Sequence, residues 1–247
     1  MKLFITGLTG YLGCFVKHYL DDCNISYVSL SRKEGIIGNL EKWEGGISEL
    51  DFEVLTKTKF DAFLHMAALY DLKASKAKCQ MANVVGTSHA LRIAQKLKIP
   101  HFIHISSIAA AINSPFPNVS PYDLAFDRDF PDFYSESKAQ AEQLVRNFVG
   151  PFGRLNVRLG ILVGDTQNGL IQRLDGPYTA IKAFESVRKM LKKWPGPLPL
   201  PGKETTTLPL VPVDYAAQSI VKLVDDFVRK KDHGTYQSVH LVPKKGL

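Results

Sequence analysis

The chain has 247 residues, of which 45% are hydrophobic and 22% are charged, and its formal net charge is +7. This composition excludes an intrinsically disordered chain, and no apolar run is long enough to predict a membrane-spanning helix. The excess of basic residues favours an anionic partner, while Cys14, Cys23 and Cys79 lack metal-type spacing and predict a reduced, cytoplasmic protein with three buried thiols.

Apolar, strand-like segments alternate with helix-like segments along most of the chain. The predicted strands are residues 2–6, 24–31, 61–67, 101–105, 156–163 and 235–242. The predicted helices are residues 11–20, 81–97, 134–148 and 213–229. Because parallel strands need long crossovers, this alternation predicts an α/β fold with a Rossmann-type doubly wound parallel sheet.

Two segments interrupt the alternation. Residues 109–133 contain four prolines and five aromatic residues, and predict a long loop that either has a binding or lid role or packs on the surface. The second segment contains a basic helix near residues 180–194, followed by PGPLPLPG. We therefore expect one unit, in which residues 1–165 and 205–247 form the dinucleotide-binding core and residues 166–204 form a small substrate-covering lobe.

The sequence TGLTGYLG at residues 6–13 directly follows the first strand and opens the first helix. Gly7 permits a tight turn, Gly10 lets the backbone approach a pyrophosphate, and Gly13 allows close packing of helix on strand. The helix N-terminus directs N–H donors and a partial positive charge at the phosphates. The residues predicted to hold the pyrophosphate are Gly7, Thr9, Gly10, Tyr11, Leu12 and Gly13.

The end of the second predicted strand indicates which cofactor is bound. An acidic residue there would favour NAD(H) by bonding the adenosine ribose, but this chain has Ser31, Arg32 and Lys33, with no carboxylate before Glu34. An arginine at this position suits a 2′-phosphate through charge-assisted hydrogen bonds, so NADP(H) is favoured over NAD(H). The alternative is a solvated basic turn.

Tyr134 and Lys138 are four residues apart at the start of a predicted helix and therefore project from one face. A tyrosine with the ordinary pKa of about 10 is a poor base, but a nearby ammonium favours the phenolate, so the pair suits proton transfer to or from a carbonyl oxygen. Ser106 and Ser107 follow the fourth strand at the ligand-binding edge of the sheet. One of these hydroxyls is expected to bond the reacting oxygen, unless both cap backbone groups.

The glycine turn, the serine and the Tyr–Lys pair stand in an order that resembles the extended short-chain dehydrogenases/reductases, over nearly the whole chain. HMAA at residues 65–68 resembles the family's stretch along the cofactor and adds Ala67 and Ala68 to the expected cofactor site. NVVGT at residues 83–87 resembles the N-V-x-G-T helix segment of that family. The resemblance implies that Tyr134 is the acid/base, Lys138 lowers its pKa and binds the nicotinamide ribose, Ser107 orients the substrate, and Asn83 supports the site. On the residues alone, Asn83 reads as a surface helix residue.

Three later stretches resemble the acyl-thioester and fatty-acyl reductase branch: RLGILVGD at residues 158–165, LDGPY at 174–178 and LVPVDYAA at 210–217. This implies NADPH-dependent reduction of a thioester on coenzyme A or a carrier protein. The last stretch is equally explained by a strand entering a helix capped by Asp214.

This chain departs from the family pattern at three places. Leu159 replaces a usual proline near the nicotinamide, and Gly46-Ile47 replaces an aspartate beside the adenine. The chain ends at Leu247, soon after the last predicted strand, so a minimal or truncated family member is expected.

Three functions follow as hypotheses, none with a metal site. The first is an NADP(H)-dependent reductase of a small-molecule carbonyl or a thioester-linked substrate, and the second is a sugar-nucleotide epimerase or dehydratase, or a small-ketone reductase. The third is a non-catalytic cofactor sensor or nucleic-acid-binding regulator, although no nucleic-acid motif is present. Basic residues within the predicted lobe form either a solvated face or a contact for an acidic carrier protein or coenzyme A: Lys182, Arg188, Lys189, Lys192 and Lys193.

Overall fold

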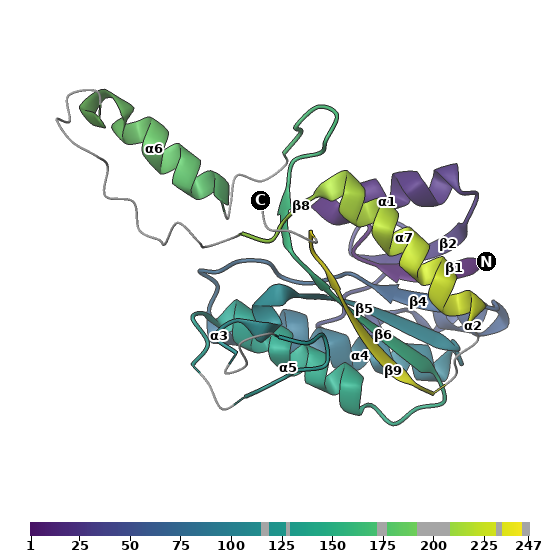
Figure 1. Cartoon of the computed structure of the whole chain (residues 1–247). Coiled ribbons are helices and arrows are strands. Elements are labelled where there is room, and N and C mark those ends of the chain that lie inside the picture. Colours follow the sequence, from purple (N-terminus) through teal and green to yellow (C-terminus); the bar gives the residue numbers. More distant parts are fainter. Residues whose placement is uncertain (115–118, 127–128, 172–176, 192–207, 231–233, 244–247) are drawn as a thin grey trace.

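The computed structural model describes residues 1–114, 119–126, 129–171, 177–191, 208–230 and 234–243. Its centre is a seven-stranded sheet in the order β3-β2-β1-β4-β5-β6-β9, and all neighbouring strands run parallel (Figure 1). The strands are β1 (Lys2–Thr6), β2 (Ser26–Ser31), β3 (Ile36–Ile37), β4 (Ala62–His65), β5 (His101–Ser107), β6 (Gly153–Leu159) and β9 (Tyr236–Leu241). The predicted doubly wound parallel sheet is confirmed.

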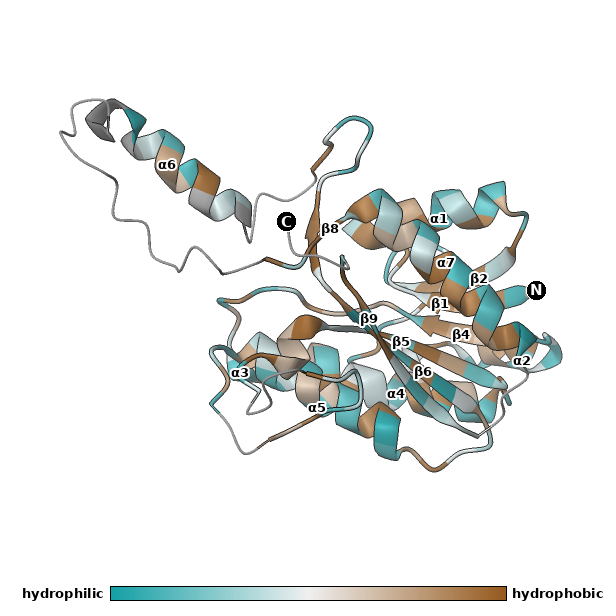
Figure 2. Cartoon of the chain, viewed as in Figure 1, coloured by the Kyte–Doolittle hydropathy of each residue, from teal (hydrophilic) through white to brown (hydrophobic). Residues whose placement is uncertain are grey.

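Helices cover both faces of this sheet and enclose two separate apolar clusters. One face packs against α1 (Tyr11–Asp22) and α7 (Val213–Arg229). The other packs against α2 (Glu49–Lys57), α4 (Gly86–Lys96) and α5 (Phe133–Asn147). In Figure 2, brown residues predominate in β1 and β4, whereas the helices carry both brown and teal residues, as expected for elements with one buried side.

The order of the strands places a crevice between β1 and β4. From β1 the chain moves outward through α1 to β2, whereas from β4 it moves in the opposite direction, through α4 to β5. Ligands of doubly wound sheets bind at such a reversal, beside the carboxyl ends of the strands.

A second, two-stranded parallel sheet pairs β7 (Ile161–Val163) with β8 (Leu210–Pro212). The strand predicted over residues 156–163 is divided at Gly160, where an added Cβ would lie 2.5 Å from the Pro209 carbonyl oxygen. The close approach of residue 209 therefore requires glycine at the point where the chain passes from the main sheet to the second sheet.

The helix α6 (Pro177–Leu191) extends away from the main sheet on the side of β7 and β8 (Figure 1). The Tyr178 hydroxyl accepts a hydrogen bond of 2.8 Å from the Gly164 backbone N–H. Lys182 and Arg188 are exposed on this helix. The side chain of Lys189, and Lys192 and Lys193, lie outside the described residues, as does much of the predicted 166–204 lobe, so that division stays a prediction.

Several local expectations were wrong. Cys14 and Cys23 are exposed free thiols, because both lie on the outward side of α1 or at its end, and only Cys79 is buried. The helix predicted over residues 81–97 begins as α3 (Lys76–Cys79) and a π-helical turn at Gln80–Val85 before α4. The short α2 and β3 were not anticipated, whereas β8 is the strand that the stretch at residues 210–217 allowed.

Further short turns connect these elements: η1 (Trp43–Gly46), and η3 (Ile108–Ala111) after β5. Within the described ranges, no helix combines the length and the apolar character that crossing a bilayer requires.

Candidate active site

A cleft of about 1440 Å³ follows the carboxyl ends of the central strands. Its lining includes the glycine turn at one end and Tyr134 and Lys138 at the other. The structure therefore brings together, in one cavity, groups that are separated by about half of the sequence. Of the residues predicted to bind cofactor or substrate, Lys33 and Asn83 are not among the lining residues.

The glycine turn fits a bound pyrophosphate. Gly7 has φ +89°, and a Cβ there would lie 2.6 Å from the Ala67 backbone nitrogen, so β1 and β4 require glycine at this position. A Cβ on Gly13 would lie 2.6 Å from the Leu8 backbone, so the packing of α1 requires glycine there too. Gly10 meets no such obstacle, since its nearest neighbour is 3.3 Å away.

Gly10 is the N-cap of α1, which has no side-chain cap and no acidic residue in its first turn. The N-terminal N–H groups of this twelve-residue helix thus open onto the cleft beside a residue without a side chain. This arrangement suits phosphate oxygens, which supply the acceptors that a cap would otherwise supply.

The expected adenosine end of the cleft lies where β2 ends. The Ser31 hydroxyl donates to the Glu34 carbonyl (2.7 Å) and accepts from the N–H groups of Lys33 (3.1 Å) and Glu34 (2.9 Å). A hydroxyl has one donor and two acceptor positions, so Ser31 is fully used in closing its own turn. Arg32 lines the cleft and is left as the group that suits a phosphate.

The turn at residues 38–41 also lines this end, and sequence analysis did not identify it. Asn39 and Glu41 contribute to the lining, and the Asn39 side-chain oxygen accepts from the Glu41 N–H at 3.0 Å. Gly46 and Ile47, placed by resemblance near the adenine, do not line the cleft, and Ile47 packs against the apolar cluster under α4. A carboxylate is thus present near the cofactor end, on a different turn from the expected one.

His65 lies behind the cleft at the end of β4 and joins two threonines. Its Nδ1 is 2.8 Å from the Thr6 hydroxyl, and its Nε2 is 3.1 Å from the Thr87 hydroxyl. Because the Thr87 hydroxyl donates to the Asn83 carbonyl (2.6 Å), it must accept from Nε2–H, and Nδ1 then accepts from Thr6. Burial and the nearby Lys138 lower the pKa of His65 to about 3, which agrees with this neutral tautomer.

Ala67 and Ala68, which follow β4, both line the cleft as the resemblance implied. The Thr6 hydroxyl that contacts His65 also accepts from the Ala67 N–H at 3.4 Å. The buried histidine therefore fixes the backbone along which a cofactor would lie.

Tyr134 and Lys138 project from the first turns of α5 toward Ser107 at the end of β5. Asp132 caps this helix by accepting from the Ser135 N–H at 2.7 Å. The Ser107 side chain bonds Tyr134 and also accepts from the Ala109 N–H at 3.1 Å. Lys138 donates from Nζ to the Ile105 carbonyl at 2.8 Å, which places the ammonium at the strand end beside Ser107.

The two neighbouring serines have different surroundings because side chains alternate along a strand. Ser107 faces Tyr134, whereas Ser106 is buried and donates to the Glu142 carboxylate at 3.1 Å. The geometry therefore favours Ser107, as the resemblance did, for contact with a substrate oxygen.

The protonation of the pair differs from expectation. Burial raises the pKa of Tyr134 well above its usual value, against the lowering effect of the Ser107 hydrogen bond. Burial also lowers the pKa of Lys138 to about 8, although Glu142 opposes this change. The lysine was expected to lower the pKa of the tyrosine, but in this structure desolvation dominates and Tyr134 is a protonated phenol at neutral pH.

Asn83 is buried in the π-helical turn before α4 and is not the surface residue that its sequence context indicated. Its side-chain oxygen accepts from the Leu69 N–H (2.7 Å), and its side-chain nitrogen donates to the Leu69 carbonyl (3.1 Å) and the Ser137 hydroxyl (2.9 Å). Asn83 thus holds the segment after β4 against α5. π-Turns of this kind occur often at functional sites.

Two further residues shape the tyrosine end. The ring of Tyr70 packs edge-on against Tyr134 with centroids 5.1 Å apart, and no sequence motif identified it. Leu159 lines the cleft beside Ser107, its partner in the β5–β6 register. The position that differs from the family pattern therefore lies at the Ser107 end of the cleft.

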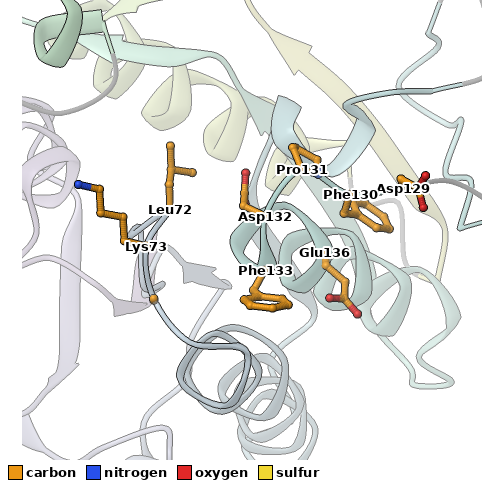
Figure 3. Close-up of a pocket in the computed structure, with 9 residues that line it drawn as sticks. Leu72, Lys73, Asp129, Phe130, Pro131, Asp132, Phe133 and Glu136 are labelled. Carbon is orange, nitrogen blue, oxygen red and sulfur yellow. The ribbon is translucent and has the colours of Figure 1, made fainter.

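A second hollow of about 560 Å³ adjoins the cleft, since Leu72 and Asp132 line both. Figure 3 shows Leu72 on one side of this hollow and Asp132 and Phe133 on the other. Leu72 and Phe133 are about half exposed. Space thus continues beyond Tyr134, away from the glycine turn, where a substrate has room.

Side chains from two helices hold the segment after β7 at the mouth of the cleft. The Tyr11 hydroxyl contacts the carbonyls of Val163 (3.2 Å) and Leu170 (3.0 Å), so it points toward this segment although its residue lines the cleft. Asp214 accepts from the Thr166 N–H at 3.2 Å; it lies in the first turn of α7, whose N-cap is Pro212, so the predicted cap was wrong.

The fold and this cleft define an NAD(P)-binding protein of the extended short-chain dehydrogenase/reductase type. A family model described as "Male sterility protein", an NAD-binding family, matches residues 16–220, and the chain belongs to this family. The matched range begins just after the glycine turn.

Individual relatives agree with this assignment. A ketoreductase of Stigmatella aurantiaca, named for 4-hydroxy-2-methyl-3-oxo-4-farnesyl-3,4-dihydroquinoline-1-oxide, is 30% identical over 181 residues, which are 70% of this chain and 54% of the relative. The chain thus spans about half the length of that relative.

Two solved structures share the fold. The terminal R domain from the myxalamid PKS-NRPS biosynthetic pathway superimposes with a TM-score of 0.79 at 23% identity, covering 100% of this chain and 66% of that one. A thiolation-reductase di-domain from an archaeal non-ribosomal peptide synthetase superimposes with a TM-score of 0.71 at 18% identity, covering 90% of this chain and 53% of the other.

Proposed function

We propose that this protein reduces a thioester-linked acyl group with NADP(H), and that Tyr134 supplies the proton. The observation that carries the proposal is the convergence of Tyr134, Ser107 and Lys138 at the end of a cleft that begins at the glycine turn. The similarity to a thiolation-reductase di-domain supports a carrier-linked substrate, with coenzyme A thioesters as the free form of the same chemistry.

The site residues divide the work of a carbonyl reduction. NADPH, when bound, would supply the hydride to the thioester carbonyl carbon, and the aldehyde would form as the carbon–sulfur bond breaks and the thiol of coenzyme A or the carrier leaves. Tyr134 is protonated because burial raises its pKa, so its hydroxyl is ready to donate a proton to the carbonyl oxygen as negative charge develops there. Ser107 bonds the same phenol and orients that oxygen, while the Lys138 ammonium stabilises the phenolate that remains.

Oxidation of NADPH with acyl-CoA and carrier-linked thioesters tests this function directly. Tyr134→Phe should lower the rate by about 10²–10⁴-fold, the usual contribution of general acid catalysis. Tyr27→Phe is a matched control, since that hydroxyl bonds Asp21 on the helix α1. Equal rates for Tyr134→Phe and the parent would contradict the proposal that Tyr134 supplies the proton.

The cofactor preference is a separate part of the proposal. Arg32→Gln should weaken NADPH binding at least about tenfold, since a hydrogen bond to a charged group contributes about 1.5–3 kcal/mol, and should leave NADH binding nearly unchanged. Lys33→Gln is the control, because Lys33 is exposed and does not line the cleft. Calorimetric titration of both cofactors measures these affinities. Equal losses for NADPH and NADH would assign Arg32 to another role.

A further inference from the structure

One turn beyond Lys138, helix α5 carries a buried ion pair. The pair consists of Glu142 on α5 and Arg158 on β6, whose side chains are 1% and 0% exposed. A guanidinium nitrogen of Arg158 lies 2.6 Å from the Glu142 carboxylate. A buried ion pair often contributes little net stability, because removing both charges from water costs as much as their attraction returns. Stability alone therefore does not explain this pair.

All five N–H donors of Arg158 have acceptors. Nε and one Nη2–H bond the Glu142 carboxylate, and the other Nη2–H bonds the Asp123 carbonyl at 2.5 Å. The two Nη1–H groups bond the Ser120 carbonyl (3.2 Å) and Nε2 of His240 (3.3 Å). The guanidinium is thus held rigidly, and it ties the described segment 119–126 to α5.

Glu142 is connected to the catalytic lysine through adjacent residues of β5. Its carboxylate accepts from the Ser106 hydroxyl at 3.1 Å, while Lys138 donates to the carbonyl of Ile105 at 2.8 Å. Lys138 and Glu142 are also four residues apart on α5, so they share a face of the helix. The carboxylate and the ammonium are therefore both buried and contact adjacent residues of β5.

Among the described residues, the other titratable groups that interact with Lys138 carry no negative charge at neutral pH. His65 from β4 and His104 from β5 face it and are kept neutral by burial. Tyr134, on the same helix, is a protonated phenol. Arg158 from β6 is positive and lies beyond Glu142. Glu142 is consequently the group that favours the charged form of Lys138, against the desolvation that removes its proton.

We propose that Glu142 and Arg158 are positioning residues for the reduction: Glu142 keeps Lys138 charged and seated on β5, and Arg158 fixes that carboxylate and the segment 119–126 over α5. The inference rests on the proposed function and extends it to two residues that do not line the cleft. It predicts that the pair controls the pH range of catalysis, whereas a purely structural pair controls only folding.

The pH dependence of kcat/KM tests the proposal, with saturating NADPH and a thioester that the parent reduces. In Glu142→Gln the alkaline limb should move down by about one pH unit, which lowers the rate at pH 8 about fivefold. Arg154→Met is the matched control: Arg154, also on β6, bonds the carbonyls of Arg146 and Phe148 at the end of α5, away from Lys138. The Arg154→Met variant should have a lower melting temperature, but the alkaline limb of its pH profile should not move.

If Glu142→Gln does not fold, a double variant without either charge serves as the test. The double variant Glu142→Leu/Arg158→Met replaces both partners with apolar side chains and should fold, with the alkaline limb displaced in the same direction. An unchanged limb in a folded variant would overturn the proposal.

A second readout separates this inference from the proposed function. In protein labelled with ¹³C at lysine Cε, the Lys138 signal is assigned by its loss in Lys138→Met, and its titration needs neither substrate nor turnover. If no thioester or other carbonyl is reduced but the Lys138 titration moves down in Glu142→Gln, the reductase assignment fails and the coupling stands. If reduction occurs and neither the titration nor the limb moves, the positioning role fails.

Discussion

The two faces of β5 and β6 differ in chemistry, although neighbouring residues of the same strands supply both. The face toward α7 is apolar and consists of Ile103, Ile105, Leu155 and Val157. The face toward α5 is polar near the cleft and consists of His104, Ser106, Asn156 and Arg158. Equal burial can therefore serve two purposes: the apolar face stabilises the sheet, and the polar face, in the role proposed above, positions the side chains of α5.

The largest expected effect comes from breaking the ion pair on the polar face. Arg158→Ala should lower the free energy of unfolding by about 3–5 kcal/mol, because it leaves the Glu142 carboxylate buried without a cation. Leu155→Ala on the apolar face should cost about 2–5 kcal/mol through lost burial and a cavity. Urea denaturation measures both values.

A second substitution, Glu142→Leu, should restore the free energy of unfolding on the polar face and not on the apolar face. Adding Glu142→Leu to an Arg158→Met variant should restore most of the lost stability, because it removes the unpaired charge. Adding Glu142→Leu to Leu155→Ala should bring no such recovery. A loss below about 1 kcal/mol for Arg158→Ala would show that water reaches the pair.

Acid should first weaken the structure around two buried histidines, His104 on the polar face and His65 on the neighbouring strand β4. His65 and His104 are neutral when buried, so between the unfolded pKa of about 6.5 and their lowered folded values the unfolded chain binds more protons. Their stabilising contribution is complete above pH 6.5 and is lost as the pH falls. For His65, with a pKa of about 3, the loss at pH 5 is about 2 kcal/mol, and His104 acts in the same direction.

His104→Leu is the matched test of this pH dependence. Neither ring nitrogen of His104 has a hydrogen-bond partner among the described residues, so replacing the ring should stabilise the protein by about 1–3 kcal/mol at pH 7. It should also flatten the fall in stability between pH 7 and pH 5. Urea midpoints at the two pH values decide the matter, and an unchanged slope would mean that other groups control acid sensitivity.

The last comparison concerns the hydrogen bonds around His65. Thr87→Val removes the hydroxyl between the His65 ring and the Asn83 carbonyl and should cost about 1–3 kcal/mol, because it leaves a buried donor unpaired. The comparable change on the apolar face is Ile105→Val, at about 0.5–1.5 kcal/mol. Thermal melts of the two variants provide the comparison, and a smaller loss for Thr87→Val would contradict the proposed donor directions.

Sequence patterns identified the parts of the molecule that depend on local order. The strand β1 at residues 2–6 and the helix α7 at residues 213–229 were predicted to the residue, since each is a periodic segment with clear limits. The glycine turn was equally readable, because spacing alone places it between a strand and a helix.

What the sequence did not reveal depends on contacts between distant segments. Arg158 and Glu142 are charged residues of a type usually exposed, and their burial follows only from the docking of α5 on β6. Tyr70 has no motif of its own. The raised pKa of Tyr134 likewise follows from burial, which the spacing of tyrosine and lysine does not encode.

One of the acceptors around Arg158 comes from a distant strand, which bears on the order in which β6 and β9 fold. His240 on β9 follows Arg158 by 82 residues, so the guanidinium gains its last acceptor only after the C-terminal strand has docked. Closing so long a loop is slow compared with forming local helices. The Arg158 guanidinium is therefore expected to stay hydrated during most of folding. It becomes fully buried when β9 pairs with β6.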